Sequence, residues 1–408
     1  MRILQPPDLV TRRLAWVTLV NTVGNGLLVS TIALYLVRFV GLSAGDVALG
    51  ASVSSLSGLV ASVLIGRLAD RRDPRMLLIA LTALQGLGTA TYLFVQSLSG
   101  YLATSAVVGA CAFSSVAVRN TLVGRILSPT ERVGSLAYLR AVTNAGMGAG
   151  SCLTLIAVSF GTLRAFQLTI AVDVLTFAAA VLLLTQIAPV GRSGKIHDRG
   201  ERGSINFSNL RFLLFAIYAG ALYVHSGLMD TGIALWVTLR TTAPDSTIGI
   251  TLAMESILVV LLQVRMSRGI TTNRQAGLAC LYAAFLLVLA CALFALSAAL
   301  SDWLAGAVVI LGGVAHVGGE ILLAAGTWTL SFSLAPRSMV GRYQGIFTGS
   351  QASARMFAPL LITVTAINLG AVGWAVLAAW FAVFGALVWR VAAQTDPVRD
   401  ATLASGTP

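Results

Sequence analysis

Residues 66–75 read GRLADRRDPR and join two long apolar stretches of the chain. Gly66 has no side chain, so a neighbouring helix can approach the backbone closely at this point. Asp70 follows four residues later, and its carboxylate can lie at the positive amino-terminal end of another helix or pair with an arginine. Arg71 and Arg75 add positive charge to the same tight turn. The segment therefore predicts a junction between two helices that contacts a further helix.

The flanking apolar stretches belong to a chain with the composition of a membrane protein. It has 408 residues, of which 57% are hydrophobic and 10% charged, whereas soluble domains carry about 25% charged residues. Stretches such as 101–118, 165–184 and 276–300 approach or exceed the ~18–20 residues that cross a bilayer as a helix. We therefore predict an all-α membrane protein with twelve transmembrane helices. We expect them at residues 14–37, 47–66, 76–96, 101–123, 134–158, 166–188, 211–236, 247–264, 276–299, 304–328, 341–366 and 373–391.

The arginines predict the orientation of these helices. Alternate loops hold only Arg38, Arg164 and Arg240, and the other loop arginines lie on the side of the amino terminus. Twelve spans put both termini on one side, which the positive-inside rule places in the cytoplasm. The first span follows Arg12 and Arg13 without an Ala-x-Ala cleavage site, so we expect the amino terminus to be retained. A composition rich in arginine and alanine, with one lysine, indicates a bacterial source and hence the bacterial cytoplasmic (inner) membrane.

Several function classes lack their sequence signatures. The net charge of +12 is divided among many short loops, which argues against nucleic-acid binding. The four cysteines lie in apolar stretches without a Cys-x-x-Cys spacing, and the three histidines are dispersed, so we expect neither a disulfide framework nor a metal site. The chain has no phosphate-binding glycine loop and no Gly-x-Ser-x-Gly elbow. We therefore expect no cofactor and no enzymatic activity.

The chain divides at its longest polar segment, residues 189–210, which we expect to be a cytoplasmic linker. Residues 1–188 and 211–392 would then form two six-helix halves, with a cytoplasmic tail at 393–408. Weak internal symmetry is typical of transporters, although chance similarity between glycine- and alanine-rich helices explains it as well. The residues that match at a constant offset are Pro129, Gly134 and Asn144 in the first half and Pro336, Gly341 and Gln351 in the second.

The segment at residues 66–75 resembles the loop signature of the major facilitator superfamily, both in its residues and in its place between the second and third helices. The family pattern has a second glycine where this chain has Asp73. The resemblance implies two pseudo-symmetric six-helix halves that rock around a central site. It also implies that Gly66, Asp70, Arg71 and Arg75 form a cytoplasmic gate motif.

Residues 144–150, NAGMGAG, form a glycine-rich run in the fifth predicted helix. The run is similar to the exporter signature of drug/proton antiporters, although it lacks the proline of that signature. Close packing of helices through small residues explains such a run equally well. The first interpretation favours export, and the second says nothing about direction. The loop that corresponds to residues 66–75 in the second half, from Arg265 onward, is basic but lacks the aspartate.

Polar residues within the predicted spans are candidates for the substrate cavity. An ionisable residue at bilayer depth costs at least ~2.5 kcal/mol on insertion scales, and residues four apart share one helix face. Under the resemblance, the helices that carry such pairs line the cavity or its sides. Arg140 and Arg355 could bind an anionic substrate or act as counter-charges, whereas Arg119 and Asp173 are expected to be structural. The pairs are Asn21 with Asn25, Arg140 with Asn144, Gln351 with Arg355, and His316 with Glu320.

Acidic residues within the spans are candidates for proton coupling. A carboxyl group in a low-dielectric cavity can exchange protons near neutral pH. Counting ~1.5 Å per residue puts Glu255 and His316 near the midplane, and Glu255 is the first candidate. Its alternative role is a fixed ion pair with Arg355. Glu320, together with His316, is the next candidate, and Asp230 lies either on the cavity wall or in the outer vestibule.

These features predict a secondary active transporter that exports a small, amphipathic molecule by proton antiport with alternating access. A solute importer or a uniporter of the same fold is the alternative, because a fold does not determine direction or substrate. The expected partners are the small-molecule substrate, protons and membrane lipid. We expect the protein to be a monomer.

Overall fold

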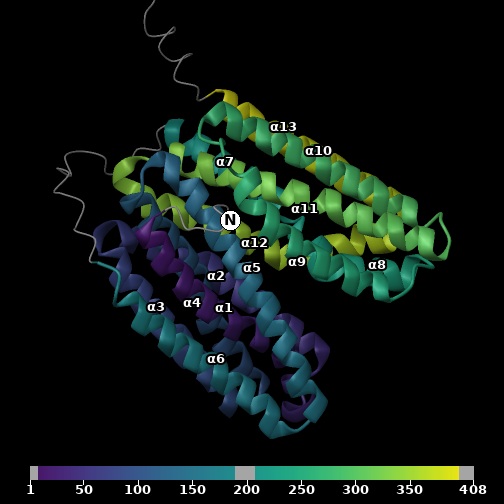
Figure 1. Ribbon diagram of the computed structural model, residues 1–408, viewed down its shortest axis with the longest axis horizontal. Coiled ribbons are helices and arrows are strands. Elements are labelled where there is room, and N and C mark those ends of the chain that lie inside the picture. Colours follow the sequence, from purple (N-terminus) through teal and green to yellow (C-terminus); the bar gives the residue numbers. More distant parts are fainter. Residues whose placement is uncertain (1–7, 189–206, 395–408) are drawn as a thin grey trace, which may run out of the picture. The chain divides into compact units, whose positions relative to one another are not determined.

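The computed structural model describes residues 8–188 and 207–394, and within these ranges all regular structure is helical (Figure 1). Many helices begin at a polar residue that accepts a backbone N–H, among them Ser43, Ser97 and Thr272. The elements are α1 (Leu9–Tyr35), η2 (Leu36–Val40), α2 (Ala44–Arg71), α3 (Pro74–Thr91), η3 (Tyr92–Phe94), α4 (Leu98–Ile126), α5 (Pro129–Phe160), α6 (Leu163–Leu184), α7 (Phe207–Tyr223), η4 (Leu228–Gly232), α8 (Ile233–Arg240), α9 (Ser246–Met266), α10 (Asn273–Ser297), α11 (Asp302–Ser333), η5 (Arg337–Met339), α12 (Val340–Ile362), η6 (Thr363–Ile367) and α13 (Ala371–Ala393).

Eleven helical segments of the described residues are long and apolar enough to cross a membrane, judged by length and composition. One of them, Leu210–Arg240, combines α7, η4 and α8. The more polar α12, which carries Arg342 and Arg355, is not among the eleven. The eleven segments and α12 together correspond to the twelve predicted helices. The predicted linker and tail lie outside the described residues, apart from their ends.

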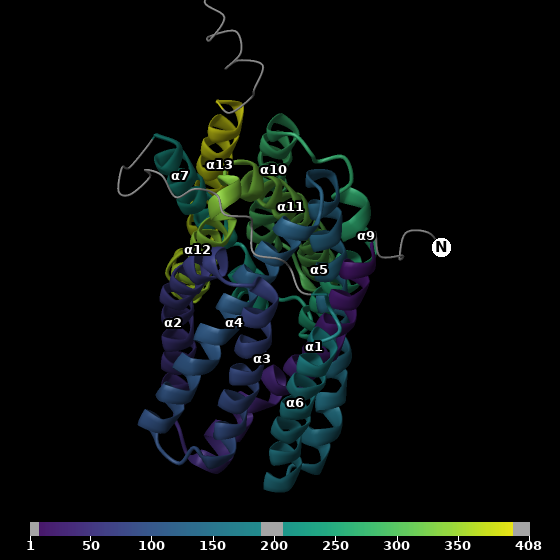
Figure 2. The ribbon, with the colours of Figure 1, turned by 90° about the vertical axis from the view of Figure 1, so that its left-hand side faces the viewer.

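The chain forms two compact units, and the first comprises Met1–Glu201 and Arg337–Met356. Here α1 packs against α5 and α6, while α4 packs against α2 and α3. Figure 2 shows α2, α4, α3 and α6 following one another across this unit. The first residues of α12 belong to this unit, so α12 begins in one unit and ends in the other.

Small residues bring α1 and α5 into backbone contact. A side chain at Gly146 would meet Thr22, and one at Gly150 would meet the backbone of Val23. From the other helix, Gly26 lies against the backbone of Met147. Two glycines of the predicted exporter-like run therefore serve close packing. Gly148 lies in open space, so packing against another element does not explain this third glycine.

The second unit comprises Arg202–Pro336 and Phe357–Pro408, in which α10 packs against α11 and α13, and α9 packs against α11. The predicted seventh helix at 211–236 lies within one span, Leu210–Arg240, but this span is not a single α-helix. The α-helix ends at Tyr223, and the π-helical turn η4 precedes α8. Gly227, just before η4, lies closely against Ala358 and Ile362. π-helical turns occur often at functional sites.

Candidate functional site

Asp70 lies near the carboxyl end of α2 and caps the first turn of α12. Its Oδ1 accepts the backbone N–H of Gly341 at 2.6 Å, and its Oδ2 accepts that of Arg342 at 2.8 Å. The first N–H groups of a helix have no partner within the helix and form its positive end, so a carboxylate stabilises them. The predicted contact of Asp70 with the amino-terminal end of another helix is therefore present in the first unit.

Gly66 allows the backbones of α2 and α12 to meet. A Cβ atom at Gly66 would overlap the carbonyl oxygen of Gly341, and one at Gly345 would overlap the carbonyl oxygen of Ser62. The hydroxyl of Ser62 donates a hydrogen bond to the carbonyl oxygen of Gly345 at 3.2 Å. The glycine and the aspartate of the signature thus act on the same neighbouring helix.

The arginines around this turn have different positions. Arg75 donates hydrogen bonds to the carbonyl oxygens of Leu184 at 3.3 Å and Thr185 at 2.5 Å, at the end of α6. Arg71 is exposed. Asp73, which replaces the second glycine of the family pattern, caps α3 by accepting the N–H of Arg75 at 2.9 Å. Of the two predicted gate arginines, Arg75 therefore binds the end of another helix.

Sequence reasoning missed Arg125, on α4. Its Nη2 donates to the carbonyl oxygens of Ala69 at 2.8 Å and Asp70 at 3.0 Å, and lies 3.8 Å from the Asp70 carboxylate. Arg125 therefore holds the end of α2 and pairs with the carboxylate that caps α12. The only signal in the sequence was a basic residue in another loop that is predicted to be cytoplasmic.

In each of the polar pairs of α1 and α5, the side chain of the second residue bonds to the backbone of the first. The side-chain amide of Asn25 donates to the carbonyl oxygen of Asn21 at 3.0 Å, and that of Asn144 donates to the carbonyl oxygen of Arg140 at 3.0 Å. All four side chains are half-buried. Gly146 meets Thr22, which neighbours Asn21 in the chain, so both pairs lie near one level of the α1–α5 contact.

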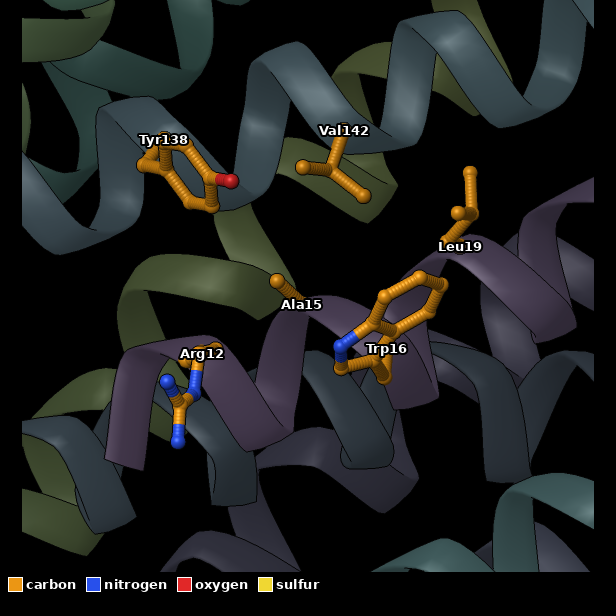
Figure 3. A pocket seen from close by; sticks show the side chains of 6 residues that line it. All are labelled: Arg12, Ala15, Trp16, Leu19, Tyr138 and Val142. Carbon is orange, nitrogen blue, oxygen red and sulfur yellow. The ribbon is translucent and has the colours of Figure 1, made fainter. Parts of the chain in front are cut away.

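A pocket of about 260 Å³ lies between α1 and α5 (Figure 3). Ala15, Trp16, Leu19 and Val142 give it apolar walls, while Arg12 and Tyr138 contribute polar groups. Leu19 is two residues before Asn21, and Tyr138 is two residues before Arg140, so on each helix the pocket lining and the predicted substrate residue point to different faces. None of the predicted substrate residues lines this pocket. Sequence reasoning did not select its aromatic residues, since aromatic side chains are common throughout membrane helices.

The second unit brings three of the predicted proton-coupling residues together. Donor atoms of Glu255 on α9 and of His316 and Glu320 on α11 all lie within 4.8 Å of one another. We call these residues the Glu255–His316–Glu320 cluster. His316 and Glu320 are buried, and Glu255 is half-buried. Asp230, the fourth candidate, lies on the π-helical turn η4 and is exposed.

His225 orients the imidazole of the cluster. The Nε2 atom of His316 lies 3.1 Å from the Nδ1 atom of His225 and 3.1 Å from its backbone carbonyl oxygen. Both histidines are buried. Sequence reasoning did not name His225 as a site residue, because nothing in the spacing of the histidines shows that α11 and the segment after α7 meet.

The remaining charged candidates have other surroundings. Asp173, expected to be structural, is fully buried on α6, where Thr176 donates to its Oδ1 at 3.3 Å and Gly24 of α1 lies against the carboxylate. Gln351 and Arg355 lie on α12, with Gln351 half-buried and Arg355 exposed. The ion pair of Glu255 with Arg355, which is the alternative role of Glu255, stays a prediction.

Residues 14–359 match the sequence profile of the Major Facilitator Superfamily. The chain belongs to the major facilitator superfamily. No curated protein sequence matches this major facilitator protein. Its family and fold make it a multi-pass membrane transporter of the alternating-access type and not an enzyme.

Solved structures share the fold of this major facilitator protein. The crystal structure of the human organic anion transporter MFSD10 (TETRAN) is similar with a TM-score of 0.73 and 16% identity, over 94% of this chain and 100% of that chain. A bacterial homologue of the iron transporter ferroportin, in an outward-facing state, is similar with a TM-score of 0.71 and 13% identity, over 94% of this chain and 98% of that chain. The proton:xylose symporter XylE is similar with a TM-score of 0.66 and 13% identity, over 94% of each chain. At these identities the similarity concerns the fold alone.

Proposed function

We propose that this major facilitator transporter exports a small amphipathic molecule in exchange for protons. The observation that carries the proposal is the placement of Asp230, an exposed acidic side chain on a π-helical turn within a membrane span. A carboxylate facing lipid is costly, so an exposed acid within a span is expected to face a water-filled path. Such a group can take up a proton on one side of the membrane and release it on the other.

The pocket between α1 and α5 supports an amphipathic substrate. Its walls are mostly apolar, with the exposed indole of Trp16 among them, while Arg12 and Tyr138 offer a charged group and a hydroxyl (Figure 3). Ligand sites typically combine apolar walls with a few polar groups that set orientation.

The capping of α12 by Asp70 supports a gate at the end of α2. Two charge-assisted hydrogen bonds and the close Gly66 contact hold the helices in one arrangement. Alternating access requires arrangements that exchange, and an acid that stabilises a helix terminus in only one of them biases that exchange. We propose that Asp70 leaves the first turn of α12 when the cytoplasmic side opens.

The direction of transport rests on the glycine-rich run of α5. Gly148, which no packing contact explains, supports the resemblance to exporters, whereas Gly146 and Gly150 are accounted for by α1. If packing is the whole reason for the run, an importer or a uniporter is the second candidate. Counterflow without an imposed gradient would favour the uniporter.

Transport by purified protein in proteoliposomes tests the coupling. The probes are ethidium, an amphipathic cation, and carboxyfluorescein, an anion, each with and without an imposed pH gradient. We expect a gradient to drive movement of one probe, and Asp230→Asn to lower that movement at least tenfold while exchange without a gradient persists. Asp245→Asn is the matched control, because this exposed aspartate caps no helix by its side chain. Gradient-driven transport that is equal in Asp230→Asn and the wild type contradicts the proposal for Asp230.

We further propose that the protein is a monomer in the bacterial inner membrane with both termini in the cytoplasm. The arginine-poor loops around Arg38, Arg164 and Arg240 support this orientation. Reporter fusions after residue 394 and within the loop at Gly41 test it, because they should report opposite sides of the membrane. Light scattering of the purified protein tests the monomer.

A further inference from the structure

We propose that the Glu255–His316–Glu320 cluster is a binding site for a divalent transition-metal ion. One imidazole nitrogen and two carboxylate groups form a donor set that suits ions such as Mn²⁺, Fe²⁺, Co²⁺ and Zn²⁺. Bonds of about 2.0–2.2 Å would place the donor atoms roughly 3–4.4 Å apart. The donors of the cluster already lie within 4.8 Å of one another, so small side-chain rotations are enough to complete the site.

The hydrogen bond to His225 prepares the imidazole for this role. A carbonyl oxygen can only accept, so the bond at 3.1 Å between Nε2 of His316 and the carbonyl oxygen of His225 places the ring proton on Nε2. In the neutral ring, Nδ1 then carries the lone pair that a metal ion needs. Metal-binding histidines almost always donate their second N–H to a carbonyl or carboxylate oxygen in this way. This bond is an observation independent of the spacing of the three donors.

The helices hold the donors in place. His316 and Glu320 are four residues apart, so they project from the same face of α11. Glu255 comes from α9, which packs against α11 through a buried contact of Val259, Val317 and Ile321. Each of these apolar residues lies within one helical turn of a donor. The relative position of the two helices is therefore set by packing, as a preorganised metal site requires.

The charge of the cluster favours a divalent cation. Two carboxylates this close repel each other when both are ionised, and the repulsion is strong in the low dielectric of a membrane span. A single divalent ion balances both negative charges and bonds directly to both carboxylates. A metal ion at this place would also bind the imidazole of His316, because the neutral form of the ring is a metal ligand.

The inference goes beyond the proposed function, because it concerns occupancy of the cluster and assumes nothing about direction or driving force. Transport driven by protons was argued from Asp230, which lies outside the donor set. The two proposals can therefore fail separately.

Binding of Mn²⁺ to the purified full-length protein in detergent tests the site, with the loss of the free Mn²⁺ signal in electron paramagnetic resonance as the readout. The protein is prepared without a polyhistidine tag, which would bind the ion itself. We expect one ion per chain, and an affinity at least tenfold lower for each of Glu255→Gln, His316→Asn and Glu320→Gln, since each change removes one ligand. Wild-type protein that leaves the Mn²⁺ signal unchanged overturns the proposal.

Two control variants separate the site from nonspecific binding. Glu131→Gln alters an exposed glutamate in the first turn of α5. His197→Asn alters a histidine outside the described residues. Both variants are expected to bind Mn²⁺ like the wild type. Equal affinity in the wild type, the controls and the three cluster variants would mean that the ion binds elsewhere, and would overturn the proposal.

A measurement on the wild type remains decisive even where a variant does not fold. Pulsed electron paramagnetic resonance of bound Mn²⁺ should show coupling to one directly coordinated nitrogen, which must come from His316. Bound ion without any nitrogen coupling overturns the assignment. Failure of these tests leaves transport through Asp230 untouched, whereas a defect of Asp230→Asn in transport with normal Mn²⁺ binding separates the two sites.

Discussion

Asp70 and the Glu255–His316–Glu320 cluster place carboxylates in contrasting surroundings. Asp70 accepts two backbone N–H groups of α12 and lies 3.8 Å from the Arg125 guanidinium, so the protein itself supplies positive partners. In the cluster, a second carboxylate and the imidazole of His316 lie within 4.8 Å of the first carboxylate. The first arrangement stabilises a helix terminus. The second gathers electron-pair donors, which is what a cation requires.

The comparison teaches that burial of an acid does not by itself indicate function. Asp173 is fully buried, with one weak hydrogen bond from Thr176 on its own helix, and it is less suited to bind an ion than the half-buried Glu255. The kind of neighbour decides. Backbone N–H groups and arginines indicate an acid that holds a contact between helices, whereas converging carboxylates and imidazoles indicate a ligand site.

The largest expected effect comes from removing the close approach that Asp70 depends on. Gly66→Ala would place a methyl group against the carbonyl oxygen of Gly341, which forces α2 and α12 apart. Overpacking of this kind costs up to about 3 kcal/mol. We expect a clearly lower thermal unfolding temperature in detergent. Gly134→Ala is the matched control, since a Cβ atom there meets no other group, and an equal decrease in both variants would refute the role of the contact.

The next effect concerns the cap itself. In Asp70→Asn the amide oxygen can accept one N–H of α12, but the amide nitrogen cannot accept the second. Loss of a charged cap costs about 1–2 kcal/mol. The unfolding temperature should fall less than in Gly66→Ala, and Asp245→Asn should leave it unchanged, because Asp245 makes no side-chain cap. If Asp70→Asn is as stable as the wild type, the cap makes no net contribution to the free energy of unfolding.

A ligand effect should distinguish the two regions directly. At ten times its dissociation constant, an ion that binds only the folded protein stabilises it by about 1.4 kcal/mol. We expect Mn²⁺ to raise the unfolding temperature of the wild type and of Asp70→Asn by the same amount, and not to raise that of Glu320→Gln. A rise in all three proteins would place the ion outside the cluster.

The smallest effect is expected for His225→Ala. The bond that orients His316 goes to the backbone carbonyl of residue 225, which this substitution retains. Only the contact between Nδ1 of His225 and Nε2 of His316, at 3.1 Å, is lost. The Mn²⁺ affinity should therefore fall by about threefold or less, well short of the tenfold or larger loss expected on removing a ligand. A loss as large as that of His316→Asn would assign ring Nδ1 of His225, not the carbonyl, as the orienting group.

The sequence was sufficient to predict the helices and one contact. Composition and apolar length predict the spans because the bilayer requires about 20 apolar residues per helix. The spacing of Gly66 and Asp70 predicts the close approach of another helix and a contact of the carboxylate with a helix terminus or an arginine. Periodicity alone does not identify the partner. Arg125 and the first turn of α12 are distant in sequence from Asp70, and only the packing of helices brings them together.

The cluster shows the same limit more strongly. His316 and Glu320 were recognisable as a pair, because residues four apart share a face of one helix. Glu255 lies on another helix, and the absence of a His-x-x-x-His spacing led to the expectation of no metal site. Which faces of α9 and α11 meet depends on apolar residues such as Val259, whose pattern differs little from that of residues facing lipid. The donor set therefore emerged only from the fold.

The π-helical turn at Leu228–Gly232 has a consequence for how this chain tolerates changes in length. Such a turn contains one more residue than an α-helical turn, and each residue of an α-helix advances the chain by about 100° around its axis. The wider turn absorbs the extra residue, so deleting one residue here should restore a regular helix and leave the faces of the helix downstream nearly unchanged. Deleting one residue between Ile233 and Trp236, in the regular part of α8, would instead rotate the residues after it by about 100°. The indole of Trp236, edge-on to Trp374 at 5.3 Å, should therefore keep this contact in the first deletion and lose it in the second.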